Sequence, residues 1–220
     1  VVGCSIRAVI HVFRKRTGLL LRVSDLQSAF VGPITFAVDS GECVCISGPS
    51  GSGKTVLLRA IVDLDANSGK VSWASIGRSD LSAPDWRRLV GFVPAETGWW
   101  ADIVSAHFET PEPAASLLPA VGLPSAAFQW HVTRLSTGER HRLGLVRAIA
   151  QQPRVLLLDE PTASLDSAAT EKVERLLKNQ LLAGVAVVLV THDPDQIQRL
   201  ASRTLTIANG KLCDPELVNQ

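Results

Sequence analysis

The sequence predicts an α/β fold: a mixed core sheet, largely parallel and covered on both faces, with an antiparallel β layer and a helical subdomain. Three observations indicate this class. Short runs of branched apolar residues recur along the chain, with helical patterns between several of them. Alternating segments precede the first glycine-rich loop, and a later proline- and alanine-rich stretch has no strand signal. With 220 residues and 46% hydrophobic composition, the chain has ample material for a buried core.

The first elements form the predicted antiparallel layer. Residues 20–23 are typical of a strand, and residues 34–38 alternate before an Asp-Ser-Gly turn. Residues 1–18 carry basic residues after their apolar part, the reverse of a signal peptide. We therefore expect residues 1–18 to be a disordered extension, or to come from a start assigned too early, and the folded domain to occupy residues 19–220.

A strand, a loop and a helix come next. Residues 43–47 form a short apolar run that feeds a glycine-rich loop, and residues 56–64 have the apolar spacing of a core-facing helix. Four further short apolar runs predict the remaining strands of a parallel sheet, at residues 90–93, 155–158, 185–190 and 204–208.

The helical subdomain is predicted over about residues 96–152. Four prolines divide its first part into short pieces, at positions 111, 113, 119 and 124. The chain has no internal repeat and no low-complexity linker, so we expect this insertion to belong to one folded unit.

Composition limits the possible partners. Twenty-two lysines and arginines against 21 aspartates and glutamates leave a formal charge of +1, so no global charge favours nucleic acid or anionic lipid. No apolar run approaches the roughly 20 residues that span a bilayer. The four cysteines lack the paired spacing of zinc sites, so we expect Cys43 and Cys45 to be small core residues.

The glycine-rich loop carries the strongest local motif. It fits GxxxxGK[ST], in which glycines allow backbone N–H groups to point at phosphate oxygens. Lys54 is expected to reach the terminal phosphates, and the Thr55 hydroxyl is expected to ligate Mg²⁺. The helix that begins there adds its positive dipole end. The motif comprises Gly48, Pro49, Ser50, Gly51, Ser52, Gly53, Lys54 and Thr55.

Two adjacent carboxylates follow the strand predicted at residues 155–158. Asp159 and Glu160 lie at its carboxyl end, the edge where ligands bind in open α/β sheets. Because successive strand residues face opposite ways, we expect different roles. Asp159 is expected to hold Mg²⁺, and Glu160 to polarise the water that attacks the γ-phosphate of a nucleotide.

A third motif identifies a family. Leu135-Ser136-Thr137-Gly138-Glu139 opens a helical pattern and resembles the LSGGQ signature of the ATP-binding cassette (ABC) family, with threonine and glutamate as departures. From about residue 20 onward, the order of motifs also resembles that family. Ser164-Leu165-Asp166 is similar to its D-loop, and His192 to its switch histidine. The resemblance implies an ABC-type P-loop NTPase.

The resemblance also implies roles for these residues. Two cassettes in this family dimerise head to tail, so the signature residues Ser136, Thr137, Gly138 and Glu139 would contact the γ-phosphate held by the other subunit. Ser136 and Glu139 also match a helix capping box, and both roles are compatible. His192 would bind the γ-phosphate and hold the attacking water, beside Glu160. Asp166 would either couple the two sites or cap the helix that follows.

Several positions depart from the family pattern. Ala95 stands where the family usually has a glutamine near the metal, and Glu96 is either its substitute or a surface residue. Phe30 is the nearest candidate for stacking on adenine, or else a core residue. Trp99 and Trp100 would either anchor a partner helix or pack within the helical subdomain.

The function that the resemblance implies is ATP binding and hydrolysis, with Mg²⁺, by a stand-alone subunit of a membrane transporter. Its partners would be a second ABC subunit, as a homodimer or heterodimer, and a separate transmembrane permease, with no nucleic acid. It would sit at the cytoplasmic face of the cell membrane. The alternatives are a non-transport cassette, for example in metal-cluster assembly, and a cassette with weak turnover because of Ala95. A DNA-maintenance ATPase is disfavoured because no coiled coil separates the motifs.

Overall fold

A six-stranded sheet forms the centre of the protein, and the computed structural model describes residues 19–109 and 111–213. The predicted extension over residues 1–18 lies outside the described residues. The strand order is β10-β9-β3-β8-β7-β6, and the five strands from β9 to β6 are parallel. The bounds are β3 (Cys43–Ser47), β6 (Val90–Val93), β7 (Val155–Asp159), β8 (Ala186–Val190), β9 (Arg203–Ala208) and the antiparallel β10 (Lys211–Cys213).

The predicted antiparallel layer is a second, four-stranded sheet with the order β2-β1-β4-β5. Its strands are β1 (Leu19–Ser28), β2 (Val31–Asp39), β4 (Asn67–Trp73) and β5 (Ile76–Gly77). The first two strands run longer than the sequence indicated. The last two were not predicted, because Asn67–Trp73 is polar over its first four residues and gains strand structure by pairing with β1.

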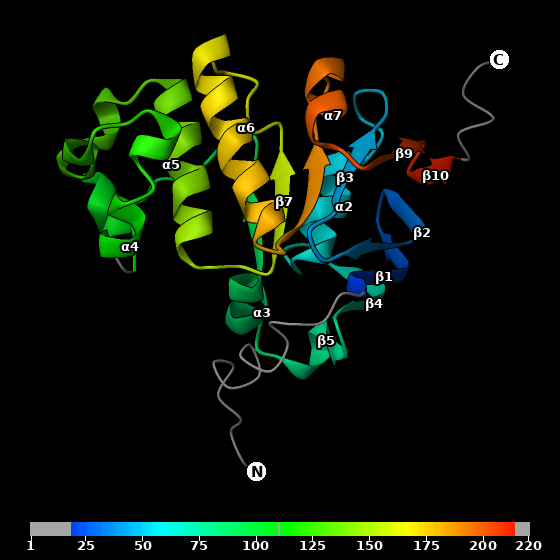
Figure 1. Ribbon diagram of the computed structural model, residues 1–220. Helices are drawn as coiled ribbons and strands as arrows, with labels where there is room; N and C mark the ends of the chain where they lie inside the picture. The colour runs from blue at the N-terminus through cyan, green and yellow to red at the C-terminus, as the bar shows by residue number, and fades with distance from the viewer. Residues whose placement is uncertain (1–18, 110, 214–220) are drawn as a thin grey trace.

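Helices flank the core sheet at α2 (Lys54–Ile61), α3 (Ala83–Leu89), α6 (Ser167–Leu182) and α7 (Pro194–Leu200). The stretch predicted to be helical contains short 3₁₀ turns and two α-helices: η2 (Val104–His107), α4 (Pro111–Ala115), η3 (Pro119–Val121), η4 (Ser125–Gln129), η5 (Val132–Arg134) and α5 (Thr137–Ala150). A 3₁₀ turn, η1 (Arg78–Asp80), follows β5. Figure 1 shows this helical region on one side of the core sheet and the antiparallel sheet on the other.

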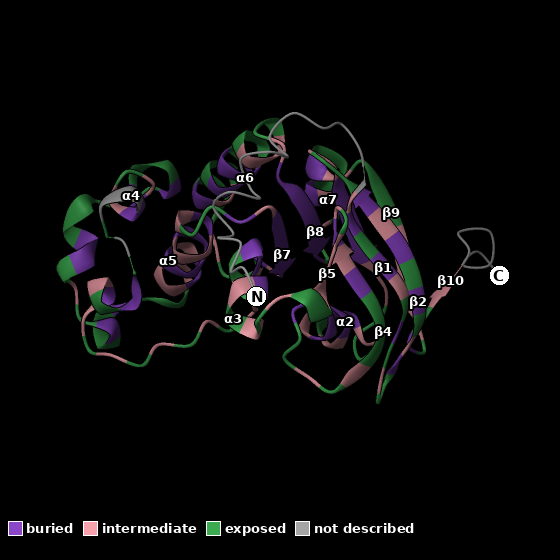
Figure 2. Ribbon diagram, turned by 90° about the horizontal axis from the view of Figure 1, so that it is seen from below, coloured by how far each residue is buried: buried purple, intermediate pink, exposed green. Residues whose placement is uncertain are grey.

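The central strands are buried on both faces, as their continuous apolar runs predict. In β7, Val155 and Leu157 pack toward the antiparallel sheet and α2, whereas Leu156 and Leu158 pack toward α5 and α6. The alternation follows from the two-residue period of a strand. Figure 2 shows buried residues along β7 and β8, between the two layers. The core sheet thus contributes residues to two hydrophobic clusters, one on each of its faces.

Some of the predicted element boundaries are wrong. The helix expected at residues 56–64 is α2, which starts at Lys54 and ends at Ile61, because the residues after Ile61 form a turn. The predictions for Cys43 and Cys45 are confirmed, since both side chains are buried. Burial raises the pKa of the Cys43 thiol to about 12 and that of Cys45 to about 11, so both stay protonated. Among the described residues, no helix combines the length and apolar character needed to span a membrane.

Candidate nucleotide-binding site

The candidate site lies at the carboxyl edge of the core sheet. Because β3, β7 and β8 are parallel neighbours, the segments that follow them meet at this edge. These segments carry the glycine-rich loop, the two carboxylates and His192, respectively. In Figure 1 these three strands lie side by side with α2. The fold therefore brings together three motifs that are spread over residues 48–192 of the sequence.

The glycine-rich loop runs from β3 into α2. Gly53 caps the helix with φ of 102°, and a Cβ atom there would collide with the Val31 side chain, so only glycine fits. The Lys54 ammonium group is buried and donates hydrogen bonds to Gly48 O (2.8 Å) and Pro49 O (2.9 Å). The lysine side chain thus lies over the loop. An anion bound at the helix N-terminus would compete with these two carbonyl groups for hydrogen bonds from the ammonium group.

Thr55 and Asp159 join the loop to the carboxylate strand. The Thr55 hydroxyl donates a 2.6 Å hydrogen bond to Asp159 Oδ2, and Asp159 is almost completely buried. The Ser52 hydroxyl is also buried and has no hydrogen-bond partner, so the loop holds an unsatisfied polar group.

These groups fit Mg²⁺, which takes oxygen ligands from one or two protein side chains and from phosphates. In the described residues, no group of three or more His, Cys, Asp and Glu could hold a metal by itself. A protein site made of one hydroxyl and one carboxylate would need phosphate oxygens and water to complete the coordination shell. The two residues predicted to hold the metal are therefore adjacent, at the end of the glycine-rich loop.

Glu160 and His192 form the second half of this edge. Glu160 N donates to Val190 O (2.9 Å). Glu160 has a φ angle of 50°, so the extended backbone of β7 ends at Asp159. His192 Nε2 lies 3.5 Å from Glu160 Oε1, an oxygen that is buried without a hydrogen bond. Burial raises the pKa of Glu160, while His192 opposes the shift. A carboxylate with a raised pKa is a better proton acceptor.

A buried polar cluster links the segment after Glu160 to the helix after His192, and it was not predicted from the sequence. The Glu174 carboxylate accepts from Arg199 Nε (2.7 Å) and Arg199 Nη2 (2.8 Å), and Gln196 Nε2 donates to Thr162 Oγ1 (2.9 Å). Thr162 follows Glu160, whereas Gln196 and Arg199 lie on the helix after His192. The cluster therefore fixes the two segments relative to each other. One signal was available, since Glu174 interrupts the apolar face of α6.

The signature residues begin α5. The Ser136 hydroxyl accepts from Glu139 N (3.2 Å), and Ser136 N donates to Glu139 Oε2 (2.8 Å), which confirms the predicted capping box. Ser136 and Thr137 remain exposed, and Gly138 packs closely against Ser164 O. Asp166 caps α6 by accepting from Ala169 N (2.7 Å), so its capping role is present. The helix N-terminus of α5 is thus ordered and accessible.

The remaining predicted positions lie around this edge. Phe30 is 77% exposed in the turn between β1 and β2, so the alternative of a core phenylalanine is wrong. Its carbonyl oxygen lies beside the glycine loop, near Gly53. Ala95 follows β6, and the Glu96 side chain is exposed. Trp99 is half-buried against the helical subdomain, whereas Trp100 is 71% exposed.

Strand, glycine loop, helix and paired carboxylates together define a P-loop α/β domain, a class of nucleotide-binding proteins. Residues 31–163, more than half of the chain, match the family described as ABC transporter. The chain belongs to the ABC transporter family, which confirms the family resemblance predicted from the sequence.

Several curated proteins to which the chain is similar are named as import ATP-binding proteins. It is 33% identical over 201 residues to the sulfate/thiosulfate import ATP-binding protein CysA of Vibrio cholerae, covering 83% of this chain and 53% of that protein. It is 36% identical over 216 residues to the aliphatic sulfonates import ATP-binding protein SsuB 2 of Mesorhizobium japonicum, covering 92% and 83%. The first four relatives are longer, and the chain spans between 53% and 60% of their length.

Solved structures confirm the predicted fold class. A dimeric ATP-binding cassette in a post-hydrolysis state, bound to ADP and Pi, matches with a TM-score of 0.78 and 25% identity, covering 89% of this chain and 97% of that one. An ATP-binding subunit of an ABC transporter matches with a TM-score of 0.77 and 21% identity, over 88% of each chain, which shows the shared fold.

Proposed function

We propose that this chain is the nucleotide-binding subunit of an ABC transporter, which binds and hydrolyses ATP to drive a separate transmembrane permease. One observation carries the proposal: the Thr55 hydroxyl of the P-loop donates a hydrogen bond to Asp159, and Glu160 is the next residue. The P-loop and a carboxylate whose pKa is raised by burial therefore lie together at the carboxyl edge of the core sheet. The family membership and the import proteins among the relatives support the same function.

Nucleotide binding would use groups that now bond within the loop. The backbone N–H groups of residues 48–53 and the α2 N-terminus attract the phosphates. Lys54 exchanges its bonds to two loop carbonyls for bonds to phosphate oxygens, which are stronger because both partners are charged. Ser52 gains the partner that its buried hydroxyl lacks. The exposed ring of Phe30, beside the loop, is available to stack on adenine.

Thr55 and Asp159 would hold Mg²⁺, and the cation supplies charge neutralisation on the β- and γ-phosphate oxygens. The Thr55 hydroxyl contributes a neutral ligand, and Asp159 contributes negative charge directly or through water. Because Asp159 is buried, its carboxylate is held in one place and loses little freedom when a cation binds.

Hydrolysis would depend on Glu160 and His192. The Glu160 carboxylate accepts a proton from a water molecule as that water bonds to the γ-phosphorus, and the bond from phosphorus to the ADP oxygen breaks. His192, 3.5 Å from the same carboxylate, donates to the γ-phosphate and restrains the water. The polar cluster around Glu174 maintains the spacing of the two groups.

The site would be completed by a second cassette. Ser136, Thr137, Gly138 and Glu139 begin a 14-residue helix whose N-terminus is accessible, and such an N-terminus favours an anion. This signature end would contact the γ-phosphate held by the P-loop of the partner subunit, in a homodimer or heterodimer. Asp166, in the segment that resembles the D-loop, would lie at the interface between the two cassettes.

The transport role is tested by identifying the subunit that remains bound to this chain after extraction from the membrane. The tagged chain is extracted with detergent from membranes of its host and the co-purifying subunit is identified. We expect a permease with transmembrane helices, which would place this chain at the cytoplasmic face of the cell membrane. A stoichiometric partner that has no transmembrane helix would contradict the transporter role and favour a non-transport cassette.

A further inference from the structure

His107 is a buried histidine whose hydrogen bonds fit only one protonation state. It ends the turn η2 and is 5% exposed. Its Nε2 atom accepts two backbone hydrogen bonds, from Trp100 N (2.9 Å) and Ala101 N (3.0 Å). Its Nδ1 atom lies 3.1 Å from Ile103 O and 3.2 Å from Val104 O, and a carbonyl oxygen can only accept. The ring is therefore neutral, with its hydrogen on Nδ1.

A second proton on this ring would oppose the bonds that it makes. Protonated Nε2 is a donor, and its hydrogen would face the N–H groups of Trp100 and Ala101, which point at the same atom. Both hydrogen bonds would be lost, and two backbone donors would need new acceptors. Histidine is the side chain that commonly gains its proton between about pH 8 and pH 5. The neutral ring thus holds the backbone at residues 100 and 101, and the protonated ring cannot.

The same imidazole also orders two tryptophans. The ring centroids of Trp99 and Trp100 lie 4.7 Å and 4.6 Å from that of His107, in edge-on arrangements. The guanidinium group of Arg147, on α5, lies 5.0 Å from the centroid of each tryptophan ring. A proton on His107 would therefore place a second cation beside the same pair of rings, and two like charges so placed repel each other.

The other titratable groups around this segment do not offset such a charge. Asp102 and Glu109, the carboxylates on either side of η2, are exposed, and Glu109 lies 3.4 Å from Arg88 of α3. His131, whose backbone forms an isolated bridge with this segment, is exposed as well. The turn η4 packs against η2 and has no ionisable side chain. In the described part of the chain, no ion pair involves His107, so a charge on this buried ring is penalised.

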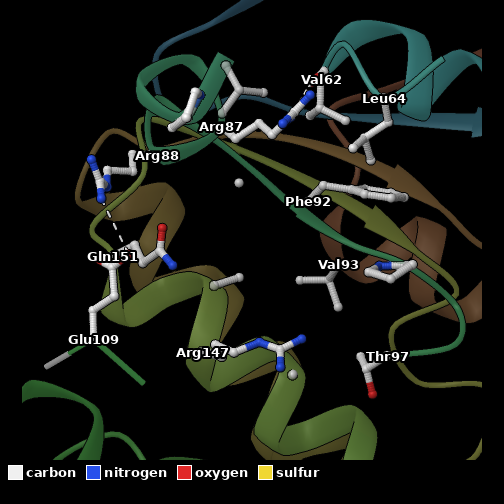
Figure 3. A pocket seen from close by; sticks show the side chains of 16 residues that line it. Val62, Leu64, Arg87, Arg88, Phe92, Val93, Thr97, Glu109, Arg147 and Gln151 are labelled. Carbon is white, nitrogen blue, oxygen red and sulfur yellow. Dashed lines mark hydrogen bonds and ion pairs between the residues drawn. The ribbon is translucent and has the colours of Figure 1, made fainter. Parts of the chain in front are cut away.

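The backbone that His107 holds connects the core sheet to the signature helix. This segment follows β6, and it contacts α5 at two places. Thr97 Oγ1 donates to Arg140 O at 3.4 Å, and Arg147 Nη1 donates to Gly98 O at 3.1 Å. Thr97 and Arg147 line the same pocket (Figure 3). Because the signature residues begin α5, release of this segment would loosen the attachment of the signature helix to β6.

We infer that His107 is a proton-sensitive positioning residue. In its neutral form it holds residues 97–101 against α5, and when it gains a proton it releases them. The consequence for catalysis rests on the proposed function. A loosened α5 would place the signature residues less accurately against the γ-phosphate held by the partner cassette, so ATP turnover would fall as the pH decreases.

Amide hydrogen exchange of the nucleotide-free full chain between about pH 8 and pH 5 tests the release. After correction for the pH dependence of chemical exchange, protection of the Trp100 and Ala101 amides should fall by about tenfold, because two hydrogen bonds are lost. The amides of β8, in the buried core sheet, serve as the internal reference and should change less. NMR titration of the His107 ring on the same sample should show that the loss of protection follows its proton uptake.

Matched variants assign the response to His107. His107→Gln keeps an acceptor oxygen near the position of Nε2 but takes up no proton in this range, so protection at Trp100 should persist to the lowest pH. His131→Gln changes an exposed histidine beside the same segment and should keep the response. The ratio of the ATP hydrolysis rate at about pH 6 to that at about pH 8 should be larger in His107→Gln than in His131→Gln. Thermal unfolding of both variants checks that the fold is intact.

Three results would overturn the inference: unchanged protection while His107 gains its proton, a response that persists in His107→Gln, or a response that disappears in His131→Gln. The exchange measurements use no nucleotide, so they decide the role of His107 even if the chain does not hydrolyse ATP. If exchange behaves as expected and the two variants have equal ratios of hydrolysis rates, the catalytic consequence alone is overturned.

Discussion

The nucleotide site and the surroundings of Arg147, between the core sheet and the helical subdomain, handle their charges in opposite ways. In the nucleotide site, Lys54 bonds to loop carbonyls and Thr55 bonds to Asp159, so these two side chains have polar partners within the chain. Around Arg147 (Figure 3), two aromatic rings and one carbonyl group hold the guanidinium, with no carboxylate among the described residues. A ligand of the first site would replace internal hydrogen bonds, whereas the guanidinium of Arg147 has no internal ion pair to give up.

The largest expected effect concerns the base of the proposed reaction. Glu160→Gln removes the proton acceptor and keeps the shape of the side chain, so steady-state ATP hydrolysis should fall by about 10²- to 10⁴-fold. ATP affinity should stay within a few-fold of the original, because P-loop contacts are unchanged. Phosphate release and ATP binding are measured on the same preparation. Unchanged turnover would remove Glu160 as the base.

A second prediction tests whether the internal bonds of Lys54 are replaced by phosphate bonds. Lys54→Ala deletes charge-assisted hydrogen bonds worth about 1.5–3 kcal/mol, so ATP affinity should weaken by roughly 10- to 150-fold. Equilibrium binding of ATP measures the change, and Lys70→Ala, an exposed position on β4, is the control. Equal affinities for the two variants would show that the nucleotide does not reach Lys54.

The pH dependence of hydrolysis tests the pairing of Glu160 with His192. The base must be ionised, and burial raises the pKa of Glu160, so the rate should fall with decreasing pH through this raised pKa. His192 lowers that pKa, so His192→Gln should move the acid limb of the kcat profile to higher pH, besides reducing the maximum. An acid limb that stays in place would show that His192 does not influence the ionisation of Glu160.

The smallest expected effect concerns Ala95, which stands where the family resemblance places a glutamine near the proposed metal site. Ala95→Gln adds one hydrogen-bonding group, worth about 1 kcal/mol, so hydrolysis or Mg²⁺ affinity should rise by about fivefold. Initial rates across a Mg²⁺ titration measure both quantities. A variant with unchanged rates and Mg²⁺ affinity would show that the native site requires no amide at position 95.

The motifs of the proposed nucleotide site could be recognised in the sequence because each of them is contiguous. The P-loop, the Asp159-Glu160 pair and the signature each occupy a few successive residues, and strand β3 has the predicted bounds. The capping box at Ser136 followed from spacing alone. By contrast, β4 was missed because its polar residues form a strand only by pairing with β1.

The surroundings of Arg147 and the Glu174 cluster were not predictable in the same way. Arg147 meets Trp99 and Trp100 only after α5 packs against the segment that follows β6. Gln196 and Thr162 are 34 positions apart and meet through the docking of α7. Such contacts depend on tertiary packing, and no local spacing encodes them. The same limit applied to Phe30, whose exposure depends on the turn between two paired strands.

We propose that the nucleotide site of this chain is half of a shared site, completed by the signature residues of a second cassette. Light scattering measures the mass of Glu160→Gln in Mg²⁺ and ATP, with the bound nucleotide quantified on the same sample. We expect a particle of two chains that holds two ATP molecules and returns to single chains when ADP replaces ATP. A particle with the mass of one chain, fully loaded with ATP, would refute the shared site.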